Sequence, residues 1–340
     1  MTETTTYDTT FTIRRGEEEI WVDRSDQWCP FSVLKHLLMT TSCNPRDTER
    51  IFEDRLESNN LTAFEIRVLL TWACKFGKTS IADLLIKQLS SDIEADPAHN
   101  YIKRLYSDRS SATRGLAPLL PAAQHGMTST VAKLLQEGEH PNCFDSKGRT
   151  PLMMAAEHGH LAVVKVLLND SRKTKVDLHV TDAAGRNVMH YATQNRMVDV
   201  CIYMIKQASH EEKFEDRHGV TALPLAAVAG LAEVVKALKK KAEDGIIDIN
   251  AACEDNKMTA LHYAVQYTLE AYRVGNKDFC SDSEWHNAAE GHDTIAALLS
   301  IPGIDANRCD ADGETALEFA ASRGNIHVVK TLLKHDKEMK

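Results

Sequence analysis

The 340-residue sequence predicts an all-α solenoid, built from short helix pairs that stack on one another and are joined by hairpin loops. The clearest unit spans residues 145–170, where a turn at Gly148 leads into two short apolar segments separated by Gly159. Gly148 permits the positive φ of a tight turn, and Pro151 suits a first helical turn, where its missing N–H costs nothing. A helix pair this short cannot bury its apolar face alone, so it needs copies of itself as neighbours.

Copies of this unit recur along the chain, and we number them as repeats one to six. The positions equivalent to Thr150 are Ala117, Thr150, Asn187, Thr221, Thr259 and Thr315. They are 33, 37, 34, 38 and 56 residues apart, so each longer step contains an insertion and the last contains a large one. Small residues at the positions of Ala155 and Ala156, followed by a glycine, recur in four of the six copies. This motif resembles that of the ankyrin-repeat family, whose period is about 33 residues.

The resemblance implies six ankyrin repeats over residues 112–340, and a function in binding other proteins. Stacked repeats of this family form a concave surface of hairpin tips and first helices, rigid enough that binding costs little ordering entropy. The positions that face this groove in the family are occupied here by Arg114, Lys147, Arg149, Glu157, His158, Arg186, Asn195, Arg217, His218, Met258, Asp312, Glu314 and Arg323.

Composition and charge are those of a folded protein without a nucleic-acid-binding face. Hydrophobic residues make up 43% of the chain and charged residues 26%, and the net charge of −9 argues against direct contact with nucleic acid. Residues 1–10 lack the pattern of a signal peptide, and no apolar run approaches the ~18 residues of a membrane span. We therefore expect a soluble monomer in the cytoplasm or nucleus, with no membrane contact. Among eight cysteines there is no CxxC pair, and Cys253 and Cys309 share one repeat position, which predicts packing residues.

The N-terminal third precedes the recognisable repeats. Residues 1–30 are interpreted either as a β-hairpin, from alternating apolar residues around residues 15–17, or as an N-terminal arm. Residues 31–90 are predicted to form a helical cap, with helices near 31–39 and 47–56 and a degenerate repeat over 61–89. Residues 91–111 are predicted to form a linker that contains one short amphipathic helix.

The fifth repeat contains the largest insertion. From Thr259 to Gly291 there are 32 residues, where Thr150 to Gly159 spans 9, so about 23 residues are inserted at about 268–289. Apolar residues after Tyr267 continue the first helix, which should therefore be longer than its counterparts. Residues 276–283 are predicted to form a loop, after which Trp285 anchors the returning chain.

No catalytic, cofactor or metal site is predicted. His158 and His160 are two residues apart and are expected to face different ways. His125 and His158 occupy the same position in adjacent repeats and are expected to lie too far apart to share a metal. His190 and His262 occupy a family position where the resemblance implies a buried, hydrogen-bonding ring. No phosphate-binding loop, nucleophile elbow or HExxH helix is present.

Two hypotheses about function follow. The first is a non-enzymatic adaptor or coregulator, including a coregulator of transcription. The second is the regulatory or targeting part of an enzyme whose chemistry lies in residues 1–60 or in a domain beyond Lys340. Groove positions in repeats one to four are basic, whereas Asp255, Asp312 and Glu314 make those of repeats five and six acidic. This pattern predicts a partner that presents an acidic segment to repeats one to four.

Overall fold

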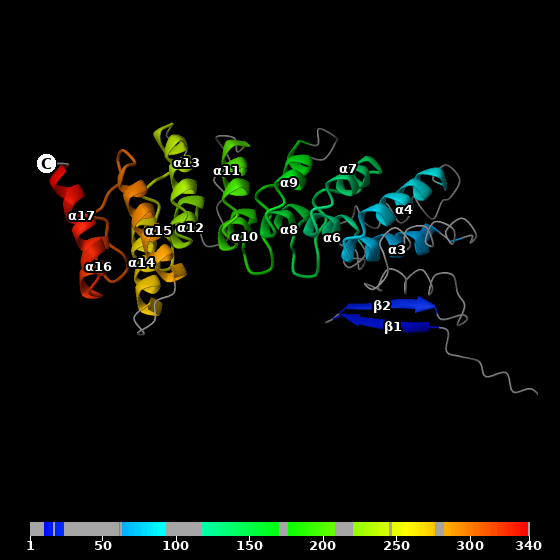
Figure 1. Ribbon diagram of the computed structural model, residues 1–340, viewed down its shortest axis with the longest axis horizontal. Coiled ribbons are helices and arrows are strands. Elements are labelled where there is room, and N and C mark those ends of the chain that lie inside the picture. The colour runs from blue at the N-terminus through cyan, green and yellow to red at the C-terminus, as the bar shows by residue number, and fades with distance from the viewer. Residues whose placement is uncertain are drawn as a thin grey trace, which may run out of the picture. The chain divides into compact units, whose positions relative to one another are not determined.

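The computed structural model describes residues 10–15, 18–23, 61, 63–92, 117–169, 176–207, 220–244, 247–275 and 282–338. The regular secondary structure of these residues is helical apart from one two-stranded hairpin near the N-terminus (Figure 1). The chain divides into two compact units, one of residues 1–155 and 162–176 and the other of residues 156–161 and 177–340. The division falls within the second repeat.

The N-terminal hairpin belongs to the first unit. Its antiparallel strands are β1 (Thr10–Arg15) and β2 (Glu18–Asp23). In this register Phe11 lies opposite Val22 and Ile13 opposite Ile20. Of the two interpretations of residues 1–30, the structure contains the hairpin.

The first unit also contains two stacked helix pairs. These pairs are α3 (Ala63–Lys75) with α4 (Thr79–Asp92), and α6 (Leu119–Gln124) with α7 (Thr128–Gln136). Within each pair the two helices pack together, and between pairs α3 packs on α6 and α4 on α7. Ala73 and Cys74, which align with Ala155 and Ala156, are fully buried in α3. The helix pair expected over residues 61–89 is therefore present, whereas the helices expected at 31–39 and 47–56 and the linker 91–111 lie outside the described residues.

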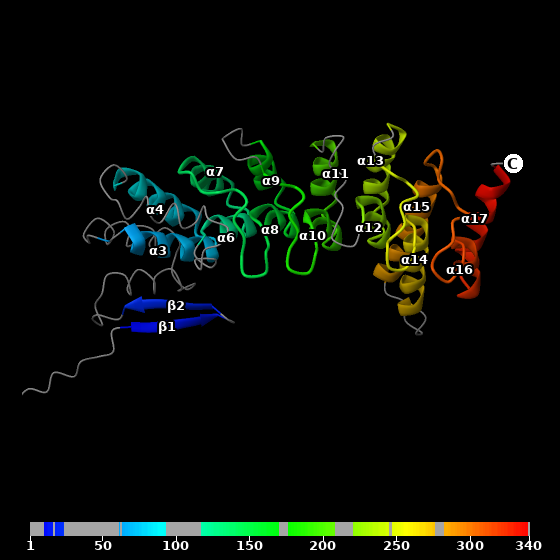
Figure 2. The same cartoon turned by 180° about the vertical axis from the view of Figure 1, so that it is seen from behind.

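The remaining helices continue the same alternation of first and second helices. They are α8 (Pro151–Glu157), α9 (Leu161–Leu168), α10 (Val188–Gln194), α11 (Val198–Gln207), α12 (Ala222–Val228), α13 (Ala232–Glu243), α14 (Ala260–Gly275), α15 (Asp282–Leu299), α16 (Ala316–Ser322) and α17 (Ile326–Glu338). In the second unit, α10, α12, α14 and α16 form one row and α11, α13, α15 and α17 a second row (Figures 1 and 2). The fold is the ankyrin-type solenoid of helix pairs that the sequence predicts.

In repeats three, four and six the residue at the Thr150 position is the N-cap of the first helix. The Thr315 side chain accepts the N–H of Glu318, whose carboxylate accepts the N–H of Thr315, so the two residues form a capping box at α16. The backbone N–H of Thr315 lowers the pKa of Glu318. Asn187 caps α10 in the same way, through His190. Side-chain caps therefore fix where α10 and α16 begin, whereas Thr221 precedes α12 without a side-chain hydrogen bond to it.

The fifth repeat departs from the expected loop. Helix α14 has 16 residues where α12 has 7, so the first helix is indeed longer than its counterpart. The expected loop at 276–283 is too long, because α15 already begins at Asp282. The two lengthened helices pack on each other so closely that a Cβ at Gly291 would clash with Oγ1 of the buried Thr268. The insertion is thus mostly absorbed as paired helix, while residues 276–281 and the Trp285 side chain lie outside the description.

Cys253 and Cys309 share a repeat position but not an environment. Cys253 is buried, as expected of a packing residue, whereas Cys309 is exposed, so the expectation was wrong for Cys309. None of the described helices has the length and apolarity needed to cross a membrane.

Cys309 is expected to react with iodoacetamide well before Cys201 at neutral to mildly alkaline pH. Burial raises the pKa of Cys201 to about 12, which leaves roughly one thiolate in ten thousand at pH ~8. Brief labelling followed by peptide mass spectrometry measures both rates. Equal rates at the two thiols would show that Cys201 is accessible in solution.

Candidate functional site

The hairpins of repeats two, three and six are built on an aspartate at the start of the turn. In each, Oδ1 accepts the backbone N–H groups of the residues two and four positions on, an arrangement that holds the turn in one conformation. The donors, at 2.8–3.0 Å, are Lys147 and Arg149 for Asp145, Ala184 and Arg186 for Asp182, and Asp312 and Glu314 for Asp310. The three hairpin tips therefore share one backbone geometry.

The second oxygen of the aspartate binds an arginine in repeats two and three. Arg149 Nε donates to Asp145 Oδ2 at 2.8 Å, and Arg186 Nε donates to Asp182 Oδ2 at 2.9 Å. Both arginines are thus paired within their own hairpins. The basic character expected for these hairpins is largely offset by the aspartates, and Lys147 supplies the exposed positive charge of repeat two.

Asp182 is the most enclosed of these aspartates, with a side chain only 2% exposed. Burial alone favours its protonated form, but hydrogen bonds from Tyr191, at 2.7 Å, and from Arg186 favour the carboxylate and hold the pKa of Asp182 below its ordinary value. The carboxylate therefore contributes stability that is fully present above the ordinary aspartate pKa of about 4 and is lost as the pH falls through the lower folded-state value.

The Asp182→Asn variant is expected to be less stable than wild type at neutral pH, because the amide cannot pair with Arg186 as a carboxylate does. The deficit should shrink as the pH falls below about 4, since Asp182 of the unfolded wild-type chain then binds a proton that the folded chain binds only at lower pH. Urea denaturation of both proteins from neutral pH to about pH 3 measures it. A deficit that does not change with pH would contradict the lowered pKa.

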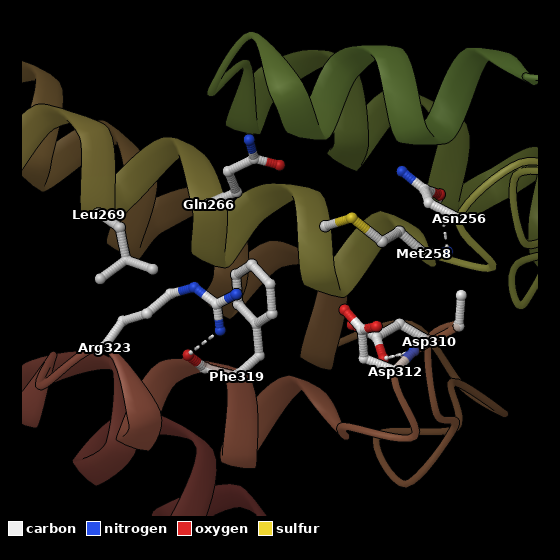
Figure 3. A pocket seen from close by; sticks show the side chains of 9 residues that line it. Asn256, Met258, Gln266, Leu269, Asp310, Asp312, Phe319 and Arg323 are labelled. Carbon is white, nitrogen blue, oxygen red and sulfur yellow. Dashed lines mark hydrogen bonds between the residues drawn. The ribbon is translucent and has the colours of Figure 1, made fainter.

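Repeat six has a different arrangement, because Glu314 stands where repeats two and three have arginine. Glu314 Oε2 accepts a hydrogen bond of 3.0 Å from Arg323, at the end of α16. The Arg323 guanidinium lies over the Phe319 ring, 3.5 Å from its centroid, and also donates to the Phe319 carbonyl. Arg323 is therefore paired with Glu314. Figure 3 shows its guanidinium over the Phe319 ring.

A pocket of about 330 Å³ lies between repeats five and six. Met258 from the fifth hairpin, Leu269 from α14 and Phe319 from α16 supply its apolar wall (Figure 3). All three side chains are at most 8% exposed, so this wall is well supported by the core. The two hairpins are joined beside it, since the Ala311 N–H donates to the Asn256 carbonyl at 2.9 Å.

The polar wall of the pocket is mainly acidic. It is formed by Asp310 and Asp312 of the sixth hairpin, with Asn256, Gln266 and Arg323 at other edges. Figure 3 shows the two aspartates next to each other, on the side away from Arg323. The site thus combines an apolar wall with two carboxylates, which suits an amphipathic cationic side chain.

The structure brings together only some of the residues predicted to face the groove. Met258, Asp312 and Arg323 line the pocket, and Glu314 is bound to Arg323. His158 and Asn195 are exposed at the ends of α8 and α10, and Glu157 is half-buried. Outside the described residues lie Arg114, Arg217 and His218.

Sequence reasoning missed Asp310 and Phe319 in this pocket. Both had a signal, because Asp310 occupies the position of Asp145 and Asp182, and Phe319 lies four residues before Arg323 on one helical face. The missing information was that Glu314 replaces the arginine with which such an aspartate pairs.

The histidines have structural roles or lie at the surface. The His262 ring is 1% exposed and lies 2.9 Å from Thr259 Oγ1 and 3.1 Å from the Glu314 carbonyl, which confirms the expected buried role. His158 and His160 do not face different ways, because the positive φ of Gly159 reverses the chain and their rings stack at 6.0 Å. Within the described part of the chain, no group of three or more His, Cys, Asp or Glu residues could hold a metal ion.

Comparison with solved structures supports the fold. The ankyrin-repeat protein EF0377 is 27% identical, with a TM-score of 0.50 over 64% of this chain and 96% of that chain. The ankyrin repeat domain of Bcl-3, a member of the IkappaB family, is 18% identical, with a TM-score of 0.54 over 78% and 97%. The human ASB11 ankyrin repeat domain is 21% identical, with a TM-score of 0.51 over 78% and 96%. At these identities the last two support the fold alone.

Family models match most of the repeat region. A family model described as ankyrin repeats (3 copies) matches residues 70–177, 119–214 and 172–252. A second model, described as ankyrin repeats (many copies), matches residues 286–333. The first match begins within α3, in the part of the chain that the sequence marks as a degenerate repeat. Because these matches cover more than half of the chain, the protein belongs to the ankyrin-repeat family, whose repeats form protein–protein interaction modules.

Proposed function

We propose that this protein is a non-enzymatic adaptor or coregulator that binds another protein through its hairpin tips and first helices. The observation that carries the proposal is the pocket between repeats five and six. It is lined by Met258, Asp312 and Arg323, three of the positions at which the family resemblance places a partner. An apolar wall beside charged groups is the usual environment of an anchoring side chain at a protein interface.

The pocket is held by contacts that do not require a partner. Asp310 fixes the sixth hairpin, the Ala311 N–H joins it to the fifth, and the Nε2 edge of His262 lies 3.1 Å from the Glu314 carbonyl. A site already ordered in the free protein loses little entropy on binding. This favours recognition by a rigid surface over folding of the site around its partner.

The structure gives less support for an acidic partner segment than the sequence alone does. Arg149 and Arg186 are offset by their own aspartates, which weakens support for an acidic partner segment, although Lys147 remains exposed. We further propose action as a monomer in the cytoplasm or nucleus, without direct nucleic-acid contact, and include transcription factors among the partner classes. The alternative, a regulatory part of an enzyme, also requires protein binding. The identity of the captured partner distinguishes the two.

Affinity capture with the full chain tests the proposal. Asp312→Lys should abolish capture of the proteins that wild type enriches from native extract, because it reverses an exposed charge at the pocket. Asp293→Lys makes the same change at an exposed position of the second helix α15 and should leave capture intact. Crosslinks from captured proteins to the fifth and sixth hairpins would support direct contact. Capture that survives Asp312→Lys would contradict this site.

A further inference from the structure

We propose that repeat six binds an arginine side chain of the partner at Asp310 and Asp312. The partner's guanidinium takes the place that the chain's own arginines take at the equivalent aspartates of repeats two and three. The inference rests on the proposed function and specifies the partner's chemistry: a basic segment that carries an arginine.

Repeats two and three each contain an aspartate–arginine pair, Asp145 with Arg149 and Asp182 with Arg186, which we call the template. In both, one aspartate oxygen holds the turn while the other accepts the Nε–H of an arginine four residues on, at 2.8 Å for Arg149 and 2.9 Å for Arg186. The arrangement therefore occurs twice in this chain with nearly the same geometry. A carboxylate used in this way is already oriented to receive a guanidinium.

Repeat six keeps the turn but lacks the arginine. Asp310 Oδ1 accepts the N–H groups of Asp312 and Glu314, both at 3.0 Å, as in the other two hairpins. Glu314 occupies the arginine position, and its carboxylate binds Arg323 instead. Among the described residues none donates a hydrogen bond to Asp310 Oδ2. Repeat six thus has the acceptor of the template without its donor.

The space beside Asp310 fits an arginine from outside the chain. The pocket of about 330 Å³ places Asp310 and the exposed Asp312 along one wall. Met258 and Leu269 offer apolar contact to the methylene groups of an entering side chain (Figure 3). Arg323 does not neutralise the two aspartates, since its guanidinium is bound to Glu314 and stacked on Phe319.

Arginine suits this site better than lysine. Its planar guanidinium carries five N–H donors in a fixed fork, so it can bind two neighbouring carboxylates at once, whereas the ammonium of lysine acts as a point charge. The template contacts also come from Nε, an atom that lysine lacks.

The test is an NMR titration of the isotope-labelled full chain with N-acetyl-arginine amide. Saturable shifts are expected at the amides of Asp312 and Glu314, which share the Asp310 carboxylate, with a Kd in the millimolar range for so small a ligand. N-acetyl-citrulline amide has nearly the same shape without the charge, and should bind at least about tenfold more weakly. Equal binding of the two compounds, or no binding of the arginine compound, would overturn the proposal.

Two variants make the test specific. Glu314→Arg restores the template within repeat six, so the new arginine should occupy Asp310 and reduce binding of the arginine compound by about tenfold or more. Asp310→Asn keeps the Oδ1 acceptor of the turn while removing the charge, and should cause a similar loss with the hairpin amide signals of the free protein little changed. Binding that survives both changes would place the compound elsewhere.

The NMR titration and the affinity capture can fail independently of each other. If the arginine compound fails to bind while captured proteins still depend on Asp312, the arginine assignment is wrong and the protein-binding function stands. If it binds but no captured protein depends on Asp312, the site recognises arginine and the proposed function fails.

Discussion

Ala156→Glu is expected to lower the free energy of unfolding by about 3–5 kcal/mol, the range seen when a charge is left buried without a partner. Ala156 is fully buried in α8, where a small side chain allows close packing. A glutamate there must either bury its charge, be protonated, or force the helices apart. Urea denaturation monitored by circular dichroism measures the change.

Ala321→Glu is the matched control for this variant. Ala321 occupies the same position in repeat six, six residues after Thr315, but it is exposed, because no further helix pair of the described chain covers it. The same substitution there should change stability by no more than about 0.5 kcal/mol. Similar losses at both positions, or a loss below about 1 kcal/mol at Ala156, would show that the repeat register is wrong.

Arg67→Met is expected to be comparably destabilising, by about 3–5 kcal/mol, through loss of a buried ion pair. Arg67 in α3 binds Glu139, just after α7, and the two side chains are only 6% and 4% exposed. Removing the arginine leaves the Glu139 carboxylate buried without its counter-charge. The measurement is urea denaturation of the variant and wild type at neutral pH.

The double variant Arg67→Met/Glu139→Leu decides whether the loss comes from the unpaired charge. Replacing a buried ion pair by apolar groups of similar size is often close to neutral, so the double variant should be more stable than Arg67→Met alone. A double variant as unstable as the single one would mean that packing, and not charge, explains the loss.

Local patterns in the sequence were sufficient to predict where the repeats and their first helices lie. The capping residues at the Thr150 position, the small pair Ala155 and Ala156, and the glycine that follows the first helix in four of the six repeats act within one repeat, over about ten residues. Such short-range features give the same structure each time they occur, because their hydrogen bonds and backbone angles are made within the segment itself. The N-caps of α10 and α16 and the buried alanines follow directly from them.

The inserted segment of repeat five shows where prediction from local sequence patterns fails. Residues 276–283 looked like a loop, yet α15 begins at Asp282 and packs along the lengthened α14. An isolated stretch of this composition gives only a weak helix signal, because most helix stability in proteins comes from tertiary packing. The partner helix decided the outcome.

The sequence by itself determined that this protein is a stack of ankyrin repeats and which positions carry the hairpin tips. Only the tertiary structure decided which of those positions are available to a partner: Arg149 and Arg186 are occupied by their own aspartates, whereas Asp310 faces a pocket. That pocket depends on contacts across long separations, such as the 52 residues between His262 and Glu314. Side chains so far apart leave no periodic signal in the chain, because their proximity is set by how neighbouring repeats pack.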